Sequence, residues 1–201
     1  MRALIKSTSF IFHPIWMPFL GTLFYFAVSP RYFPLPLIQA KLLAVAITTM
    51  FIPIVFYFLL KNLGKAESAL LNDVKERRWP LFFYILLLGL NLYQILNIYN
   101  YPALYYFFVG IFWSILTSFV LAWLKVKISL HMVGLSGLLM FVLSLSIYYH
   151  LNLIYSIALL IFALGLTATS RLQAKAHNWI ELILGFFIGL LPQIIVLNLW
   201  L

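Results

Sequence analysis

Apolar residues form seven nearly continuous runs along the chain, separated by short polar or aromatic interruptions. A membrane-spanning helix needs about 20 mainly apolar residues, and each run approaches that length. Because the runs do not alternate apolar with polar positions, they favour helices over the strands of a closed barrel. The sequence therefore predicts an all-α, polytopic transmembrane helical bundle of about six to seven helices, in a single domain over residues 1–201. The expected helices cover residues 10–29, 37–60, 80–98, 102–124, 132–148, 153–169 and 178–199.

The polar interruptions follow the parity of these helices. Since consecutive helices cross a bilayer in opposite directions, the breaks after the second, fourth and sixth helices must lie on the same side. These breaks, at residues 61–78, 125–131 and 170–177, hold nearly all the polar side chains. The other breaks hold Arg31, Lys41 and His150 with tyrosines and asparagines. We therefore expect one interfacial site built from three segments that are distant in sequence.

Composition narrows the class of protein. With 65% hydrophobic and 8% charged residues, the chain exceeds the apolar fraction of a soluble domain and predicts an integral membrane protein. Its net charge of +9 is typical of lysine and arginine at lipid headgroups, so no nucleic-acid partner is expected. The first apolar run follows Arg2 and Lys6 without a convincing cleavage site, so it is expected to be the first membrane helix.

Acidic residues and cysteines limit the chemistry. The chain has no cysteine, which excludes a disulfide framework and a thiolate metal site. Enzymes that carry pyrophosphate on Mg²⁺ need several carboxylates on facing helices. The chain has too few for that, and no metal or other cofactor is expected. The four acidic residues are Glu67, Asp73, Glu76 and Glu181.

The sixth break carries the most informative constellation. His177 and Glu181 are four residues apart, so on a helix the carboxylate lies on the same face as the imidazole, one turn away. A carboxylate that holds one imidazole nitrogen keeps the other unprotonated and aimed, as a nucleophile or base requires. Ser170 and Arg171 precede this pair, and an arginine fork suits phosphate oxygens. The alternative is a structural His–Glu pair at the start of a helix.

The fourth break adds a second histidine. Ser129 and His131 stand two residues apart at the start of the fifth helix, on the same side of the membrane as His177. A second histidine there could protonate a leaving oxygen while the first attacks phosphorus. The alternative is an ordinary interfacial histidine.

The second break supplies Lys75, Arg77 and Arg78 directly before Trp79 and Pro80. On a helix, Lys75 and Arg78 share a face and Arg77 points elsewhere. We assign Lys75 and Arg78 to phosphate and Arg77 to the lipid headgroups. A headgroup anchor alone would also explain at least one of these cations.

Taken together, these residues resemble the type 2 phosphatidic acid phosphatase family, the superfamily of lipid phosphatases and vanadium haloperoxidases. The segment from Ser170-Arg171 through His177 to Glu181 is similar to the family's SRX5HX3D signature and matches its spacing. The segment 128–131 is similar to a degenerate PSGH signature, and 75–80 to a degenerate KX6RP. The three occur in the family's order over more than half of the chain.

The signatures depart from the family pattern at four positions. Glu181 stands where the family has aspartate, and is longer by one methylene. Ile128 and Leu130 replace the proline and glycine of PSGH, and Leu71 occupies the lysine position of KX6RP. The substitution at position 130 bears on how closely the backbone approaches phosphate, since glycine permits the nearest approach.

The resemblance implies metal-free hydrolysis of a lipid phosphate monoester or pyrophosphate through a phosphohistidine. His177 would be the nucleophile, Glu181 its orienting carboxylate and His131 the general acid. The phosphate would be held by residues of all three signatures, namely Arg171, Ser129, Lys75, Arg78 and Ser170. A phospholipid or polyprenyl phosphate would be the substrate, and the sequence selects neither the lipid nor an oligomeric state.

The expected membrane and the side of the site follow from the resemblance and from the distribution of basic residues, and two other functions remain open. The resemblance implies a bacterial inner-membrane protein, and the excess of lysine and arginine on the side of the three signatures favours a site facing the cytoplasm. A non-catalytic protein that binds or transports an anionic lipid is the main alternative. A metal-dependent phosphotransferase is the third possibility.

Overall fold

The chain folds into seven helical rods, as the apolar runs predict. The computed structural model describes residue 8, residues 10–64 and residues 73–200, and contains no strand among them. Five helices are long and apolar enough to cross a membrane. The elements are η1 (Pro14–Trp16), α2 (Met17–Val28), α3 (Leu35–Ala46), η2 (Ile47–Phe51), α4 (Ile52–Asn62), η3 (Lys75–Arg77), α5 (Arg78–Leu90), η4 (Asn91–Ile95), α6 (Pro102–Trp123), α7 (Leu130–Tyr148), α8 (Ile154–Gln173) and α9 (Trp179–Leu197).

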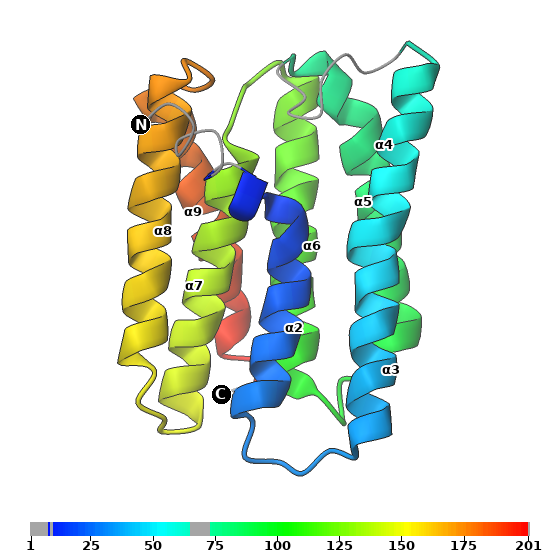
Figure 1. Cartoon of the computed structure of the whole chain (residues 1–201), viewed down its shortest axis with the longest axis vertical. Helices are drawn as coiled ribbons and strands as arrows, with labels where there is room; N and C mark the ends of the chain where they lie inside the picture. Colours follow the sequence, from blue (N-terminus) through cyan, green and yellow to red (C-terminus); the bar gives the residue numbers. More distant parts are fainter. Residues whose placement is uncertain (1–7, 9, 65–72, 201) are drawn as a thin grey trace.

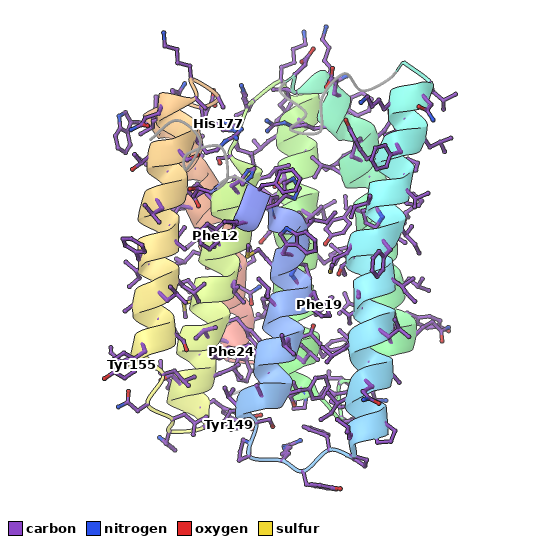
Figure 2. The ribbon with its side chains drawn as sticks, viewed as in Figure 1. Phe12, Phe19, Phe24, Tyr149, Tyr155 and His177 are labelled. Carbon is purple, nitrogen blue, oxygen red and sulfur yellow. The ribbon has the colours of Figure 1, made fainter. Side chains whose placement is uncertain are left out.

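The rods lie side by side and alternate in direction (Figure 1). One end of the bundle, which we call the motif end, holds the segments 73–78, 124–130 and 170–178. The opposite end holds the connections 29–34, 96–101 and 149–153. Figure 2 places His177 at the motif end and Tyr149 and Tyr155 at the opposite end. The parity of the helices therefore brings the three polar breaks together, as the sequence predicts.

Helix α7 occupies the centre of the bundle and packs closely against α9. Small residues permit this approach, because a Cβ on Gly189 would lie 2.1 Å from the carbonyl oxygen of Val133, and one on Gly185 would lie 2.5 Å from that of Ser129. Glycines four residues apart on one helix face form a small-residue seam typical of membrane helices. This seam fixes the start of α9 beside the start of α7, where the polar breaks meet.

Helices α2 and α6 complete the packing around this pair. Phe107 of α6 stacks on Phe141 of α7 with ring centroids 4.1 Å apart, and the amide of Gln193 donates a 3.0 Å hydrogen bond to the carbonyl of Phe107. Gly21 of α2 lies against the same Phe107 ring. The polar side chain of Gln193 is thereby satisfied inside the bundle, where an unpaired amide would be costly.

Pro53 of the second rod lies in the first turn of α4. A π-helical turn, η2, directly precedes α4 and its proline, and such turns commonly accompany a missing backbone donor. A second π-turn, η4, ends the third rod. The two turns meet through the buried side chains of Thr48 and Asn91, whose oxygens are 3.0 Å apart.

Candidate functional site

The site at the motif end is built on a histidine–carboxylate pair at the start of α9. The Nδ1–H of His177 donates to Oε2 of Glu181 at 2.5 Å. The Asn178 side chain caps α9 by accepting the backbone N–H of Glu181 at 2.9 Å, and its amide lies 3.4 Å from Oε1 of the same carboxylate. A cap and an acidic residue in the first turn both stabilise the helix start. The pair predicted by the four-residue spacing is therefore formed, with the carboxylate held from two sides.

The end of α8 delivers Arg171 to the same place. Helix α8 continues to Gln173, beyond the predicted end at residue 169, so Ser170 and Arg171 lie in its last turns and are both 2% exposed. The carbonyl of Arg171 accepts the N–H of Ala176, and Lys175 has a left-handed backbone with φ of 51°. This turn is a Schellman C-cap, which reverses the chain at the helix end. It places His177 close behind Arg171 in space.

The start of α7 joins the site through the backbone of α9. The N–H of Ser129 donates to the carbonyl of Glu181 at 3.1 Å. The Ser129 side chain is 0% exposed, and its hydroxyl has no hydrogen-bond partner within the described part of the chain. A buried hydroxyl in this state can donate to an anion. His131, two residues on, is 6% exposed and lies in the first turn of α7.

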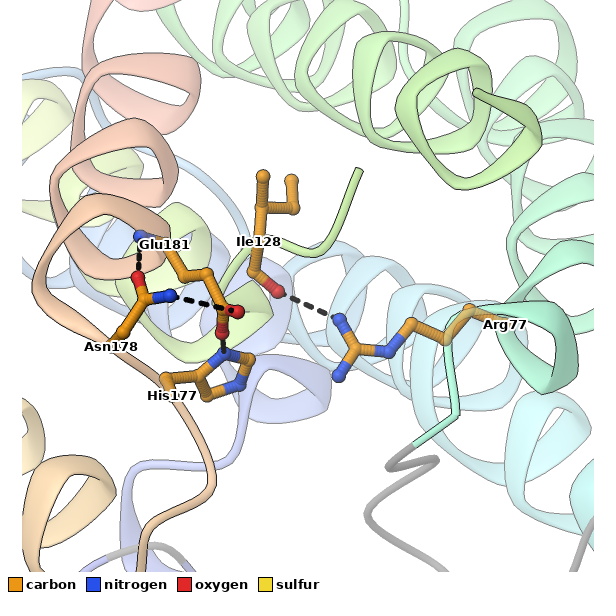
Figure 3. Close-up of polar contacts among 5 residues, drawn as sticks. All are labelled: Arg77, Ile128, His177, Asn178 and Glu181. Atoms are coloured by element: carbon orange, nitrogen blue, oxygen red, sulfur yellow. Dashed lines mark hydrogen bonds and ion pairs between the residues drawn. The ribbon is translucent and has the colours of Figure 1, made fainter. Parts of the chain in front are cut away.

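Arg77 is the member of the second break that points inward. It is 4% exposed, and its Nη1 donates to the carbonyl of Ile128 at 2.7 Å. Figure 3 shows its guanidinium facing the imidazole edge of His177 that is turned away from Glu181. The site thus holds an arginine from η3 as well as one from α8.

Lys75 and Arg78 lie on another face. Lys75 is exposed, and Arg78 donates to the carbonyls of Ala122 and Trp123 and lies 4.5 Å from the Trp123 ring. Both line a groove between α5 and α6 with aromatic walls, away from the residues that line the hollow beside His177. The helix-face prediction grouped Lys75 with Arg78 correctly, but it assigned this face to phosphate, and the structure turns Arg77 toward His177 instead. The position of Leu71 lies outside the described residues.

A histidine that the sequence interpretation did not single out also lies here. His13, which caps η1, contacts His131 edge to face with ring centroids 5.3 Å apart and planes at 79°. The parity of the helices places the start of the first rod on the motif side, so this signal was present in the sequence. A lone histidine before a proline carried no spacing motif that would distinguish it from an interfacial residue.

Burial and neighbouring charges both change the pKa values of the groups in the site. Burial lowers the pKa of His177, and the nearby Arg77 and Arg171 lower it further against the opposing effect of Glu181. Burial also lowers the pKa of Arg77, with a contribution from Arg171. His177 is therefore a neutral imidazole at pH 7, with its proton on Nδ1 and a lone pair on Nε2.

A hollow opens to the surface beside the His177–Glu181 pair. A shallow hollow of about 360 Å³ is lined by His177, Glu181 and Asn178, together with Lys127 and Lys175. Within the described ranges, no three histidines or acidic residues are grouped so as to hold a metal ion. The charges of Lys127 and Lys175 at this hollow suit an anion.

The arrangement combines an aimed imidazole, two buried arginines, a buried hydroxyl and a second histidine. It can bind a phosphate and present a nitrogen nucleophile to it. Comparison with known proteins identifies no relative: the chain matches no protein-family model, no curated protein and no solved structure.

Proposed function

We propose that the protein is a metal-independent lipid-phosphate phosphatase that acts through a phosphohistidine at His177. The observation that carries this proposal is the His177–Glu181 hydrogen bond, formed beside the buried Arg77 and Arg171. A structural His–Glu pair would not require two arginines buried beside it. Burying two guanidinium groups close to each other is costly, and an anion bound beside them would offset part of that cost, which favours a site whose ligand is an anion.

The reaction proceeds in two steps. The lone pair on Nε2 of His177 attacks phosphorus, the N–P bond forms, and the P–O bond to the lipid breaks. His131 gives a proton to the leaving oxygen. Water then attacks the phosphohistidine, gives its proton to His131, and releases inorganic phosphate and neutral His177. Glu181 holds the imidazole and stabilises the positive charge that develops on it.

The phosphate is held by Arg171, Arg77 and Ser129. The arginines supply charge, and the Ser129 hydroxyl supplies a donor that has no acceptor within the described residues. Arg77 takes the role that the sequence assigned to Lys75 and Arg78. Ser170, buried next to Arg171, supports the last turn of α8.

The substrate class follows from the position of the site. The hollow opens at the end of an apolar bundle, so a phosphorylated lipid can reach it while its chains remain in the bilayer. Phospholipid and polyprenyl phosphates both fit this description. The lysine-rich motif end favours a site on the cytoplasmic side of a bacterial inner membrane.

One observation favours the alternative of an anionic-lipid binder without catalysis. Nη1 of Arg77 is already bonded to the Ile128 carbonyl, at a position where the family has a proline. An arginine committed to the backbone contributes less to a transition state. A binder would retain phosphate affinity but would release no product.

The proposal is tested by phosphate release from purified protein in detergent micelles across a panel of lipid phosphates, with and without EDTA. We expect EDTA-insensitive release from at least one lipid, its loss in His177→Ala and a strong decrease in His131→Ala. His150→Ala, at the opposite end and exposed, is the matched control and should keep native rates. Full release by His177→Ala would contradict the proposed mechanism, and binding without release from any lipid would favour the alternative.

A further inference from the structure

His13 is the element of the site that comes from the start of the chain. Its ring lies against His131, 118 positions later in the sequence, with a centroid distance of 5.3 Å and an interplanar angle of 79°. Edge-to-face contact between rings of this kind restricts the orientation of both. The contact involves the one histidine of α7, so it bears on the group that the proposed reaction uses as its acid.

The tautomer of His13 is fixed by the backbone. The N–H of Ile15 donates to Nδ1 of His13 at 3.3 Å, so in the neutral ring the proton is on Nε2. Burial, and to a smaller extent the charge of Arg171, lower the pKa of His13 to about 4. His13 is therefore a neutral ring of defined orientation at pH 7, unsuited to donate a proton to a leaving group itself.

The backbone of η1 is seated firmly on α7. A Cβ on Gly134 would lie 3.2 Å from Pro14 and 3.0 Å from Met17, so this glycine permits the close approach of the two segments. Gly134 is three residues after His131 and on the same helix face. The close packing therefore holds His13 in place directly beside the ring of His131.

We propose that His13 is a positioning residue, which orients the imidazole of His131 toward the leaving oxygen of the lipid phosphate. The inference rests on the proposed phosphatase function. In the first step the proton passes from His131 to the oxygen as the P–O bond breaks, and His13 neither gains nor loses a proton. The N-terminal segment thus forms one wall of the site.

Two substitutions separate this role from helix capping. His13→Asn keeps a side-chain acceptor for the Ile15 N–H, since asparagine is a preferred cap, but removes the ring that contacts His131. His13→Phe keeps a ring but removes the cap and both nitrogens. His150→Asn is the control at the opposite end of the bundle.

The experiment compares a long-chain alkyl phosphate with a nitrophenyl phosphate that carries an alkyl chain of the same length. Release of the leaving group is followed in a single turnover, because the second step, in which His131 takes a proton from water, is common to both substrates. The nitrophenolate leaves without a proton, so a defect in acid catalysis in the first step affects only the alkyl phosphate. Because a general acid contributes about 100-fold or more, we expect His13→Asn to lower the single-turnover rate for the alkyl phosphate about 10-fold, with the half-saturating substrate concentration unchanged. The single-turnover rate for the nitrophenyl substrate and the apparent Tm should stay native. His13→Phe, which keeps a ring against His131, should show a smaller difference between the two substrates than His13→Asn.

Other outcomes overturn the inference. If His13→Asn hydrolyses both substrates at native rates and only His13→Phe is impaired, His13 is merely a cap. If both His13 variants hydrolyse the two substrates more slowly by the same factor, His13 supports folding or phosphate binding and does not act through His131. If His177→Ala, which leaves His13 unchanged, retains both activities, the proposed phosphatase function fails. This result is distinct from a failure of the His13 inference, which is read from the His13 variants.

Discussion

The two ends of the bundle differ in whether they bury basic side chains. At the motif end Arg77, Arg171 and His177 are buried, with Glu181 as the carboxylate beside them. At the opposite end Arg31 and His150 are exposed to the surroundings.

The remaining basic group near the opposite end follows ordinary rules. Lys41 donates to the backbone carbonyl of Ile95 and lies over the Tyr101 ring, so it is satisfied by the protein alone. Two arginines buried close to each other at the motif end support the proposed anion site, whereas the basic side chains named at the opposite end are exposed or bonded to the protein.

The largest effect is expected from separating α7 and α9. Gly189→Leu would drive a side chain into the carbonyl of Val133 and the hydroxyl of Ser136, and the surrounding helices cannot all move. We expect loss of folded protein, measured as the monodisperse fraction in size-exclusion chromatography. Gly165→Leu on α8, where a Cβ would have nothing within 4 Å, should keep native yield. Normal folding of Gly189→Leu would show that the seam does not hold the motif end together.

The second-largest effect is expected from replacing an arginine at the motif end, with an arginine at the opposite end as the comparison. Loss of one preorganised donor to a reacting oxyanion costs about 100-fold or more, so Arg171→Gln should lower kcat/KM for lipid phosphate by about that factor. Arg31→Gln should leave kcat/KM unchanged. The measurement is steady-state phosphate release at constant lipid mole fraction. Equal decreases in both variants would mean that the effect reflects overall charge at the membrane and not the site.

A smaller effect distinguishes the two faces of the motif end. Arg77→Gln removes the inward cation and should lower kcat/KM about 10-fold, because charge-assisted contacts to an anion are each worth about 1.5–3 kcal/mol and Arg77 is shared with a backbone carbonyl. Arg78→Gln acts on the groove between α5 and α6 and should change kcat/KM less than about two-fold, within the range of a surface contact. The reverse order would restore the sequence-based assignment of Lys75 and Arg78 to phosphate.

The smallest effect is on the pH dependence of stability. The pKa of His13 is lowered from its ordinary value of 6.5 to about 4, so between these values the unfolded chain binds more protons than the folded one. Stability therefore rises with pH across this window and is lost as pH falls through it. We expect the apparent Tm to decrease between pH 6.5 and 4.5, and to decrease less in His13→Asn. His150→Asn, at the opposite end, should keep the native dependence of Tm on pH. The same native dependence in His13→Asn would contradict the burial of a neutral His13.

Much of the fold was predictable because each membrane-spanning helix depends on residues that are close together in the sequence. About 20 apolar residues make one crossing, so the rods, their order and the shared side of the polar breaks follow from the sequence. The His177–Glu181 pair was predictable for the same reason, since four residues on a helix fix one geometry. The prediction ended α8 at residue 169, although the helix continues through the buried Arg171 to Gln173. A charged residue facing the bundle interior does not end a helix.

The rest of the site depends on tertiary contacts. Spacing grouped Lys75 with Arg78 and separated them from Arg77, but which face turns inward depends on how η3 meets α6 and α7. His13 belongs to no spacing motif, and only the packing of Pro14 and Met17 on Gly134 brings it to His131. Long-range packing of this kind leaves no periodic signal in the chain.

The central claim is tested most directly by trapping the intermediate on His177. Protein incubated briefly with ³²P-labelled lipid phosphate is quenched in alkali, digested, and analysed for label that is stable to base and labile to acid. We expect label on the peptide that contains His177 and none in His177→Ala. In His131→Ala, tested with a substrate that has a nitrophenyl leaving group, the second step is slowed and the amount of label should increase. Lipid phosphate turnover with no label on His177 under any of these conditions would contradict the central claim.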